Sequence, residues 1–166
     1  MAAEDGPPRG LILRVDDRLL HGQVIIGWGK GWPADEVWLV SDRIAADEFE
    51  RKLYCDTIPG SIHGGVLKVA DAIENWKSGI SFERKVIGVV ETCRDLHTLI
   101  FAGIRPTEVH LGSISCGENR VKIAESIFLN DEERRLLIEV RNRGVRTVCR
   151  PLPASAPHLV PLEEFE

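Results

Sequence analysis

The sequence predicts an α/β fold, a single domain built on a mainly parallel β-sheet with helices on both faces. Short apolar runs rich in Val, Ile and Leu alternate with longer amphipathic segments, which is the pattern of a sheet buried on both sides by helices. The length of 166 residues fits one domain with one hydrophobic core. The first run, Leu11-Ile12-Leu13, is the clearest example of a strand of this kind.

Three strands and three helices are expected in the first half of the chain, in strict alternation. The apolar runs predict strands, and the segments between them, apolar on one face, predict helices. The expected elements, in order, are a strand at 11–15, a helix at 22–31, a strand at 36–40, a helix at 43–56, a strand at 61–67 and a helix at 69–78.

The second half is expected to continue the alternation, with two strands between its two helices. Asn130 or Asp131 can cap the last helix, and the acidic Glu132 and Glu133 suit its first turn. The expected elements are a strand at 85–91, a helix at 94–103, strands at 108–112 and 121–125, a helix at 131–143 and a strand at 146–150.

Both ends of the chain differ from the segment between them. Residues 1–10 predict a flexible extension containing Pro and Gly, and residues 153–166 predict a Pro-rich acidic tail. The globular domain is therefore expected over residues 11–152.

Composition excludes several classes of function. The net charge of −5 argues against general nucleic-acid binding. No charged start precedes a long apolar run, and no run reaches about eighteen apolar residues, so we expect neither a signal peptide nor a membrane span. The four cysteines form no CxxC pair, which disfavours a zinc site and a redox motif. A cytoplasmic protein that meets the membrane only through a partner is expected.

The run from Arg14 to Val24 carries the most chemical information. It places His21 between the first strand and the first helix, among two arginines and two aspartates. An imidazole can act as a general base, a metal ligand or a nucleophile toward phosphorus. The next histidine is His63, so this segment alone does not make a metal site.

The neighbours of His21 favour the role of phosphorus nucleophile. Arg14 and Arg18 can donate forked hydrogen bonds to a phosphoryl group, and Gly22 with the free amides of a helix start favours an anion. Asp16 or Asp17 can accept a hydrogen bond from one ring nitrogen and leave the other to attack. The alternative is that the aspartates only cap the first helix and His21 is an ordinary residue at its start.

Other polar residues are expected near His21, because ligand chemistry in such sheets gathers at the carboxyl ends of strands. Ser41 follows the second strand, and Gly112 and Ser113 follow a later one as a weak phosphoryl-loop candidate. Neither GxxxxGK[ST] nor GxGxxG occurs, which disfavours a nucleotide-binding domain. Two guanidinium groups can stabilise a phosphoryl group in transfer without a metal, so we expect neither a metal nor a cofactor.

The run from Arg14 to Val24 resembles the active-site signature of the IIB components of the bacterial phosphoenolpyruvate-dependent sugar phosphotransferase system, mannose/fructose/sorbose family. The likeness continues from Val40 to Asp47. It extends more weakly to Ala102–Ile104, Val109–Ser113 and Ile127–Glu133, and covers about residues 10 to 152 in all.

The resemblance implies a phosphocarrier, a protein-N(pi)-phosphohistidine–sugar phosphotransferase. It would accept a phosphoryl group from a phosphohistidine of a IIA protein onto the δ nitrogen of His21. It would then pass the group to a sugar of the hexose class that enters through a IIC/IID membrane permease. Arg14, Asp16 and Arg18 match family positions around the histidine. For the remaining candidates only proximity is expected: Asp17, Gly22, Gln23, Ser41, Gly112 and Ser113.

The chain also departs from the family pattern. A basic residue usually precedes the tryptophan at Trp28, and this chain has Gly27 there. The family's Asn-Val-Gly-Gly-Met stretch reads His110-Leu111-Gly112-Ser113-Ile114. These changes bear on partner contacts, and the alternative function is a regulatory module that signals its phosphorylation state without feeding transport. A homodimer is possible.

Overall fold

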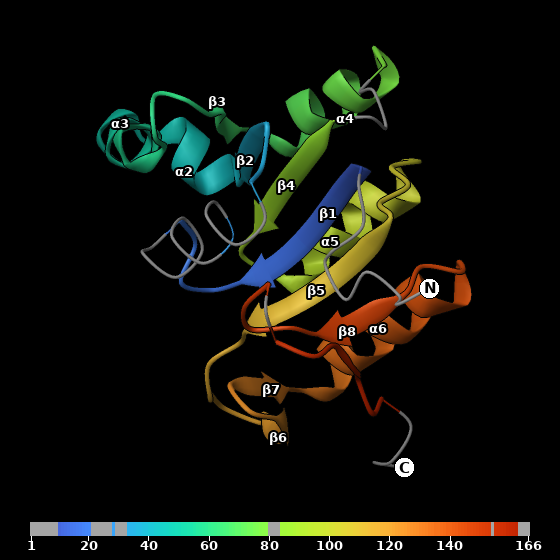
Figure 1. Cartoon of the computed structure of the whole chain (residues 1–166). Coiled ribbons are helices and arrows are strands. Elements are labelled where there is room, and N and C mark those ends of the chain that lie inside the picture. The colour runs from blue at the N-terminus through green and yellow to red at the C-terminus, as the bar shows by residue number, and fades with distance from the viewer. Residues whose placement is uncertain (1–9, 21–27, 29–32, 80–83, 154, 163–166) are drawn as a thin grey trace.

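The computed structural model describes residues 10–20, 28, 33–79, 84–153 and 155–162. They form a seven-stranded sheet in the order β3-β2-β4-β1-β5-β8-β9, in which only β9 runs antiparallel to its neighbour (Figure 1). The strands of this sheet are β1 (Gly10–Asp16), β2 (Glu36–Val40), β3 (His63–Leu67), β4 (Lys85–Val90), β5 (Glu108–Ser113), β8 (Thr147–Cys149) and β9 (His158–Leu159). The predicted α/β class with a mainly parallel sheet is confirmed.

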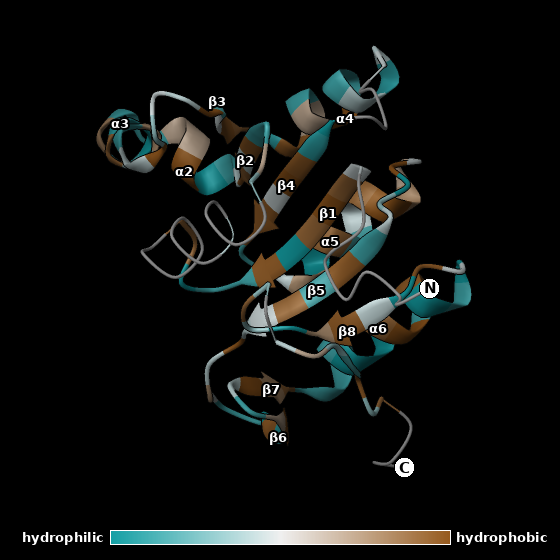
Figure 2. Cartoon of the chain, in the orientation of Figure 1, coloured by the Kyte–Doolittle hydropathy of each residue, from teal (hydrophilic) through white to brown (hydrophobic). Residues whose placement is uncertain are grey.

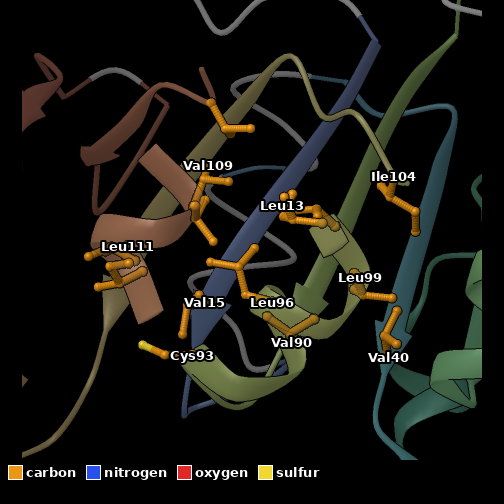
Figure 3. Close-up of a cluster of buried hydrophobic side chains, with 14 of the residues drawn as sticks. Leu13, Val15, Val40, Val90, Cys93, Leu96, Leu99, Ile104, Val109 and Leu111 are labelled. Atoms are coloured by element: carbon orange, nitrogen blue, oxygen red, sulfur yellow. The ribbon is translucent and has the colours of Figure 1, made fainter. Parts of the chain in front are cut away.

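Helices cover both faces of the sheet, as predicted. The described helices are α2 (Asp42–Ala46), α3 (Glu48–Thr57), α4 (Val69–Lys77), α5 (Cys93–Phe101) and α6 (Asp131–Asn142). One face packs against α4, α5 and α6, and Figure 3 shows Leu96 and Leu99 of α5 against Leu13 and Val15 of β1. The other face carries a second apolar cluster that includes Ile44 of α2.

The sheet is not apolar throughout. Most of its strands are hydrophobic, but β1 and β5 carry hydrophilic bands (Figure 2). Alternation along a strand explains this, because Leu13 and Val15 face α5 whereas Arg14 and Asp16 point to the opposite face. This opposite face of β1 and β5 is where the polar site is built.

Two predicted elements differ from the structure. The helix expected over 43–56 is two helices, because Asp47 has extended backbone and its side chain accepts a hydrogen bond from the amide of Glu50, which starts α3. The strand expected over 121–125 forms β6 (Val121–Ala124), which pairs with β7 (Ile127–Leu129) in a separate antiparallel hairpin. Ser126, at a φ of 62°, makes the tight turn between them.

The third strand begins later than expected. The strand expected from 61 begins at His63, and Gly64 beside it lies so close to β2 that a Cβ would stand 1.9 Å from the carbonyl oxygen of Val37. The helix expected over 22–31 falls almost wholly outside the described residues. No described helix is long and apolar enough to cross a membrane.

Part of the segment expected as an acidic tail packs onto the domain. Its β9 pairs with β8, and Val160 and Leu162 are buried in the cluster beneath α6. The composition of the segment does not reveal an apolar contact of this kind, because its apolar residues stand among prolines and glutamates without a clear periodicity. The limits drawn at residues 10 and 152 stay predictions.

Candidate functional site

The site lies where the chain leaves the carboxyl end of β1. Asp17 donates its amide to the carbonyl of Ser113 at 3.0 Å, and Leu19 donates to the carbonyl of Asp16 at 3.1 Å. Leu19 takes a φ of 59°, and with Leu20 it is buried in the second apolar cluster. This turn fixes the direction in which the chain continues to His21. His21, Gly22 and Gln23 themselves lie outside the described residues.

Asp16 is the centre of the site, and it is fully buried. Its Oδ1 accepts from the amide of Arg18 at 3.1 Å and from Arg18 Nε at 2.9 Å. Its Oδ2 accepts from Arg18 Nη2 at 2.9 Å and from Arg14 Nη2 and Nε at 3.1 and 3.3 Å. Both carboxylate oxygens are thus filled by arginine donors, so Asp16 has no capacity left for a ring nitrogen of His21.

Arg14 is turned inward and holds the end of β8 against β1. Its Nη1 donates to the carbonyl of Arg150 at 2.6 Å, and its Nη2 donates to the carbonyl of Pro151 at 2.9 Å. Burial lowers the pKa of Arg14 to about 10, although the charge of Asp16 opposes this shift, so the guanidinium stays charged at neutral pH. The forked donation to a phosphoryl group that the sequence suggested is therefore already directed to protein acceptors.

Gly112 and Ser113 lie at the end of β5, and not in a loop. A Cβ on Gly112 would stand 2.1 Å from Arg14 Nη2 and 2.5 Å from Asp16 Oδ2. The buried ion pair therefore occupies the space that any side chain at position 112 would need. The glycine that the sequence suggested as a phosphoryl-binding turn serves here to admit the Arg14–Asp16 pair.

Arg18 is the exposed member of the site. Its side chain is 30% exposed, whereas those of Arg14 and Asp16 are buried. The hydrogen bond to Asp16 raises its pKa, which keeps the guanidinium charged, and also fixes its direction. A fixed cation at the surface, three residues before His21, is placed to meet an anion that arrives there.

Asp17 belongs to the opposite face of the sheet. Its Oδ2 accepts from the amide of Ser115 at 2.7 Å, while its buried Oδ1 has no partner among the described residues. Burial works to raise the pKa of Asp17, but the hydrogen bonds of Ser115 and Ser113 outweigh it and the pKa is lowered. Asp17 is thus ionised at neutral pH, with one oxygen able to accept a further hydrogen bond.

A pocket of about 230 Å³ adjoins Asp17. Three carboxylates line it, those of Asp17, Glu91 and Glu133, against the single cation Arg120. Arg120 is paired with Glu133 at 2.6 Å. The excess of negative charge among these lining residues makes the pocket unfavourable for an anion.

Ser41 is not brought to this site. It is buried at the end of β2, where its hydroxyl accepts from the amide of Ile44 at 3.3 Å and starts α2. Strand β4 lies between β2, which Ser41 follows, and β1, which carries Arg14 and Asp16. The role of Ser41 among the described residues is that of a helix cap.

Sequence reasoning missed the residues that hold Arg14 from beneath. Trp28 is fully buried, with its ring centroid 5.1 Å from Arg14 Cζ, and its Nε1 donates to the carbonyl of Pro151 at 3.4 Å. The acceptors at Arg150 and Pro151 are backbone carbonyls more than 130 positions away, for which the sequence carries no signal.

A second buried polar pair lies next to Arg14. His110 Nε2 and Glu108 Oε2 are 2.6 Å apart on β5, and both residues are buried. Burial lowers the pKa of His110, although Glu108 opposes the shift and Arg14 and Arg150 add to it. His110 is therefore neutral at neutral pH, and its Nε2–H donates to the carboxylate.

This neutral histidine predicts a dependence of stability on pH. The unfolded chain binds a proton at His110 near the ordinary pKa of 6.5, whereas the folded chain binds it only at lower pH. The free energy of unfolding of the wild type is therefore expected to fall as the pH decreases below about 6.5. His110→Gln should reduce this loss when urea denaturation is compared at about pH 7 and about pH 5. If the free energy of unfolding falls by the same amount in the wild type and in His110→Gln, His110 is not the group responsible for the pH dependence.

Comparison with known proteins gives one consistent result. A family model described as PTS system sorbose subfamily IIB component matches residues 11–162. The PTS system fructose-specific EIIB component of Bacillus subtilis (strain 168) is 27% identical over 146 residues, which are 88% of this chain and 90% of that protein. The PTS system mannose-specific EIIAB component of Escherichia coli (strain K12) is 24% identical over 139 residues, and the match spans 43% of its length.

Solved structures agree at the level of the fold. The crystal structure of manxB from Thermoanaerobacter tengcongensis superposes with a TM-score of 0.83 at 26% identity, covering 95% of this chain and 98% of that one. The N-acetylgalactosamine-specific IIB component 1 from Escherichia coli superposes with a TM-score of 0.84 at 22% identity, covering 92% of this chain and all of the other.

Proposed function

Because the chain belongs to the sorbose subfamily of IIB components of the sugar phosphotransferase system, we propose that it carries the phosphoryl group on His21. IIB components take a phosphoryl group from IIA and pass it to the sugar, so the protein is a phosphotransferase. The family and this activity, both predicted from the sequence, are confirmed. The observation that supports His21 is the cluster of buried Arg14 and Asp16 with partly exposed Arg18, which ends three residues before His21 in the sequence.

The transfer at His21 has two steps. In the first, a lone pair of the imidazole attacks phosphorus, and the bond from phosphorus to the IIA histidine nitrogen breaks as the new bond forms. In the second, a sugar hydroxyl oxygen attacks, the bond to His21 breaks, and the hydroxyl proton leaves to a base. Both steps pass through a loose transition state whose negative charge is spread over the phosphoryl oxygens, so alignment and nearby positive charge govern the rate.

The described residues have distinct parts in this proposal. Arg18 meets the phosphoryl oxygens, because it is the exposed cation and Asp16 fixes its direction. Arg14 supports Asp16 from below and holds the end of β8. Asp17 has no part in this proposal, because it lies on the opposite face of the sheet, beside Ser115 and the acidic pocket.

Arg18→Ala is expected to slow phosphorylation by IIA about a hundredfold without unfolding the protein. Removing one well-placed donor from a site that stabilises developing charge typically has an effect of this size. Stability should change little, because the side chain is partly exposed and Asp16 keeps Arg14 as a partner. Rapid-quench measurement of transfer from phosphorylated IIA gives the rate, and thermal denaturation gives the stability.

The matched control for this change is Arg43→Ala, which removes an arginine of greater exposure from α2. It should leave the transfer rate within about twofold of the wild type, because surface ion pairs at a distance are screened. If Arg18→Ala transfers as fast as Arg43→Ala, Arg18 has no part in the chemistry.

The family supports the partners and the substrate that we propose. IIB components work with IIA and with IIC/IID membrane components. The name EIIAB of the Escherichia coli relative indicates that this protein contains both a IIA and a IIB part. We propose a sugar of the hexose class, because relatives are named for fructose, mannose, sorbose and N-acetylgalactosamine. We also propose that the protein works in the cytoplasm at the inner face of the membrane and that it assembles as a homodimer.

Sugar turnover separates transport from regulation. The protein, phosphorylated by IIA and mixed with membranes that contain its IIC/IID permease, should lose its phosphoryl group when the correct sugar is added and yield the sugar phosphate. Stable phosphorylation with every hexose tested, in membranes of proven permease content, would favour the regulatory module. Omitting the membranes is the control for hydrolysis.

A further inference from the structure

We infer that His110 is a positioning residue for the phosphoryl site: its ring sets the place of Trp28, which in turn supports Arg14. The inference rests on the proposed function only where transfer rates are concerned. It assigns a role to a buried titratable group that the proposed chemistry does not use.

His110 lies beside Arg14. The two residues are paired across the parallel strands β1 and β5, so their side chains emerge side by side from the same face of the sheet. Both are fully buried. Within this face, Glu108 and Arg150 complete a polar patch beside the apolar cluster under α2.

The ring of His110 has a fixed orientation. Its Nε2 lies 2.6 Å from Glu108 Oε2, and Arg146 Nη1 holds the other carboxylate oxygen at 3.1 Å. A neutral imidazole that donates from Nε2 to a carboxylate held on its other side cannot rotate freely about its χ angles. The hydrogen bond to Glu108 therefore fixes the orientation of the His110 ring.

The ring of His110 also contacts Trp28. The ring centroids are 4.8 Å apart with the planes inclined at 50°, which is a favourable tilted arrangement. Trp28 donates to the carbonyl of Pro151 and lies beneath the guanidinium of Arg14. Arg14 donates to that same carbonyl, so the indole and the guanidinium share one acceptor.

The chain of contacts therefore runs from Glu108 through His110 and Trp28 to Arg14, and from there through Asp16 to Arg18. Removing the ring of His110 opens a space beside Trp28, into which the indole can tilt. A shift of Arg14 would be passed to Arg18 through the carboxylate that both arginines bind. Small displacements of this kind lower transfer rates more than binding, because alignment is what the transition state requires.

Three variants separate ring packing from hydrogen bonding. His110→Ala removes both, His110→Phe keeps a flat ring against Trp28, and His110→Gln keeps a donor toward Glu108 without the ring. His110→Ala and His110→Gln should lower the maximal rate of phosphorylation by about tenfold. The half-saturating concentration of phosphorylated IIA should stay within about twofold, since the docking surface is unchanged. His110→Phe should lower the rate less than His110→Ala, because it keeps a ring against Trp28 but loses the hydrogen bond to Glu108 that sets the ring plane.

The indole N–H resonance of Trp28 gives a readout that needs no phosphoryl transfer. It is identified in ¹H–¹⁵N spectra by its loss in Trp28→Phe. The chemical shift of this resonance should change in His110→Ala and His110→Gln, which lack a ring against Trp28. It should change less in His110→Phe, which keeps one.

The outcomes are distinguishable. An unmoved Trp28 resonance in His110→Ala, or a wild-type maximal rate in that variant, overturns the positioning role. Recovery by His110→Gln and not by His110→Phe overturns the role of the ring and assigns the effect to Glu108. If the wild type accepts no phosphoryl group from IIA, the proposed function fails, while the resonance still decides whether His110 positions Trp28.

Discussion

Phosphorylation by IIA is expected to disappear when His21 is replaced by alanine. Arg18 at the end of β1 can help to bind and align a phosphoryl group, but arginine and aspartate do not form the stable nitrogen–phosphorus bond that the carrier needs. Sugar phosphorylation in the complete system should fall to the level measured without the protein. The assay is formation of sugar phosphate with an excess of phosphorylated IIA and permease membranes.

His97→Ala is the matched control. His97 lies on α5, where its Nε2 is 2.6 Å from Glu139 Oε2 on α6. This variant should keep full activity. Sugar phosphate formed at a normal rate by folded His21→Ala would remove the histidine from the mechanism.

Asp16→Asn is expected to lower the free energy of unfolding by about 3–5 kcal/mol, because it leaves the charge of Arg14 buried without a counter-ion. The two carboxylate oxygens of Asp16 accept hydrogen bonds from Arg14 and Arg18, and an amide offers only one oxygen to replace them. Transfer should also slow by at least as much as in Arg18→Ala, since Arg18 loses its fixed direction. Urea denaturation followed by circular dichroism measures the first effect.

The control for this change is Asp56→Asn, which breaks an exposed pair with Lys52 on α3. Its denaturation midpoint should be close to that of the wild type, because pairs between exposed side chains contribute little. A midpoint for Asp16→Asn that equals the one for Asp56→Asn would mean that the buried cluster does not stabilise the fold.

The strands of the central sheet and the faces of their side chains were predictable, because both depend on the sequence pattern within each strand. Runs such as Leu11–Val15 and Val37–Val40 combine apolar side chains with β-branching, and alternation along β1 places Arg14 and Asp16 on one face. Asp17 lies on the other face of the sheet, beside Ser115, and this difference from the position of Asp16 was not predicted from the sequence. The choice between Asp16 and Asp17 as partner of the imidazole was left open, because it depends on which oxygens are already bound.

Features that depend on distant residues were not predictable. The break between α2 and α3 depends on one capping side chain, Asp47, inside a segment of continuous helical character. The inward direction of Arg14 is set by carbonyls at Arg150 and Pro151, and those lie there because Val160 and Leu162 anchor the chain that follows β8. The sequence shows that Arg14 and Arg18 are present, but only the fold shows that Arg14 is buried against protein carbonyls and that Arg18 is partly exposed.

The most direct test of the account is the intact mass of the protein after incubation with phosphoenolpyruvate, the general phosphotransferase proteins and the matching IIA. The account predicts a gain of one phosphoryl group, lost on brief acid treatment as a phosphohistidine is, mapped to the peptide that contains His21 and absent from His21→Ala. No gain in mass while IIA is itself phosphorylated, or an equal gain in His21→Ala, would contradict it.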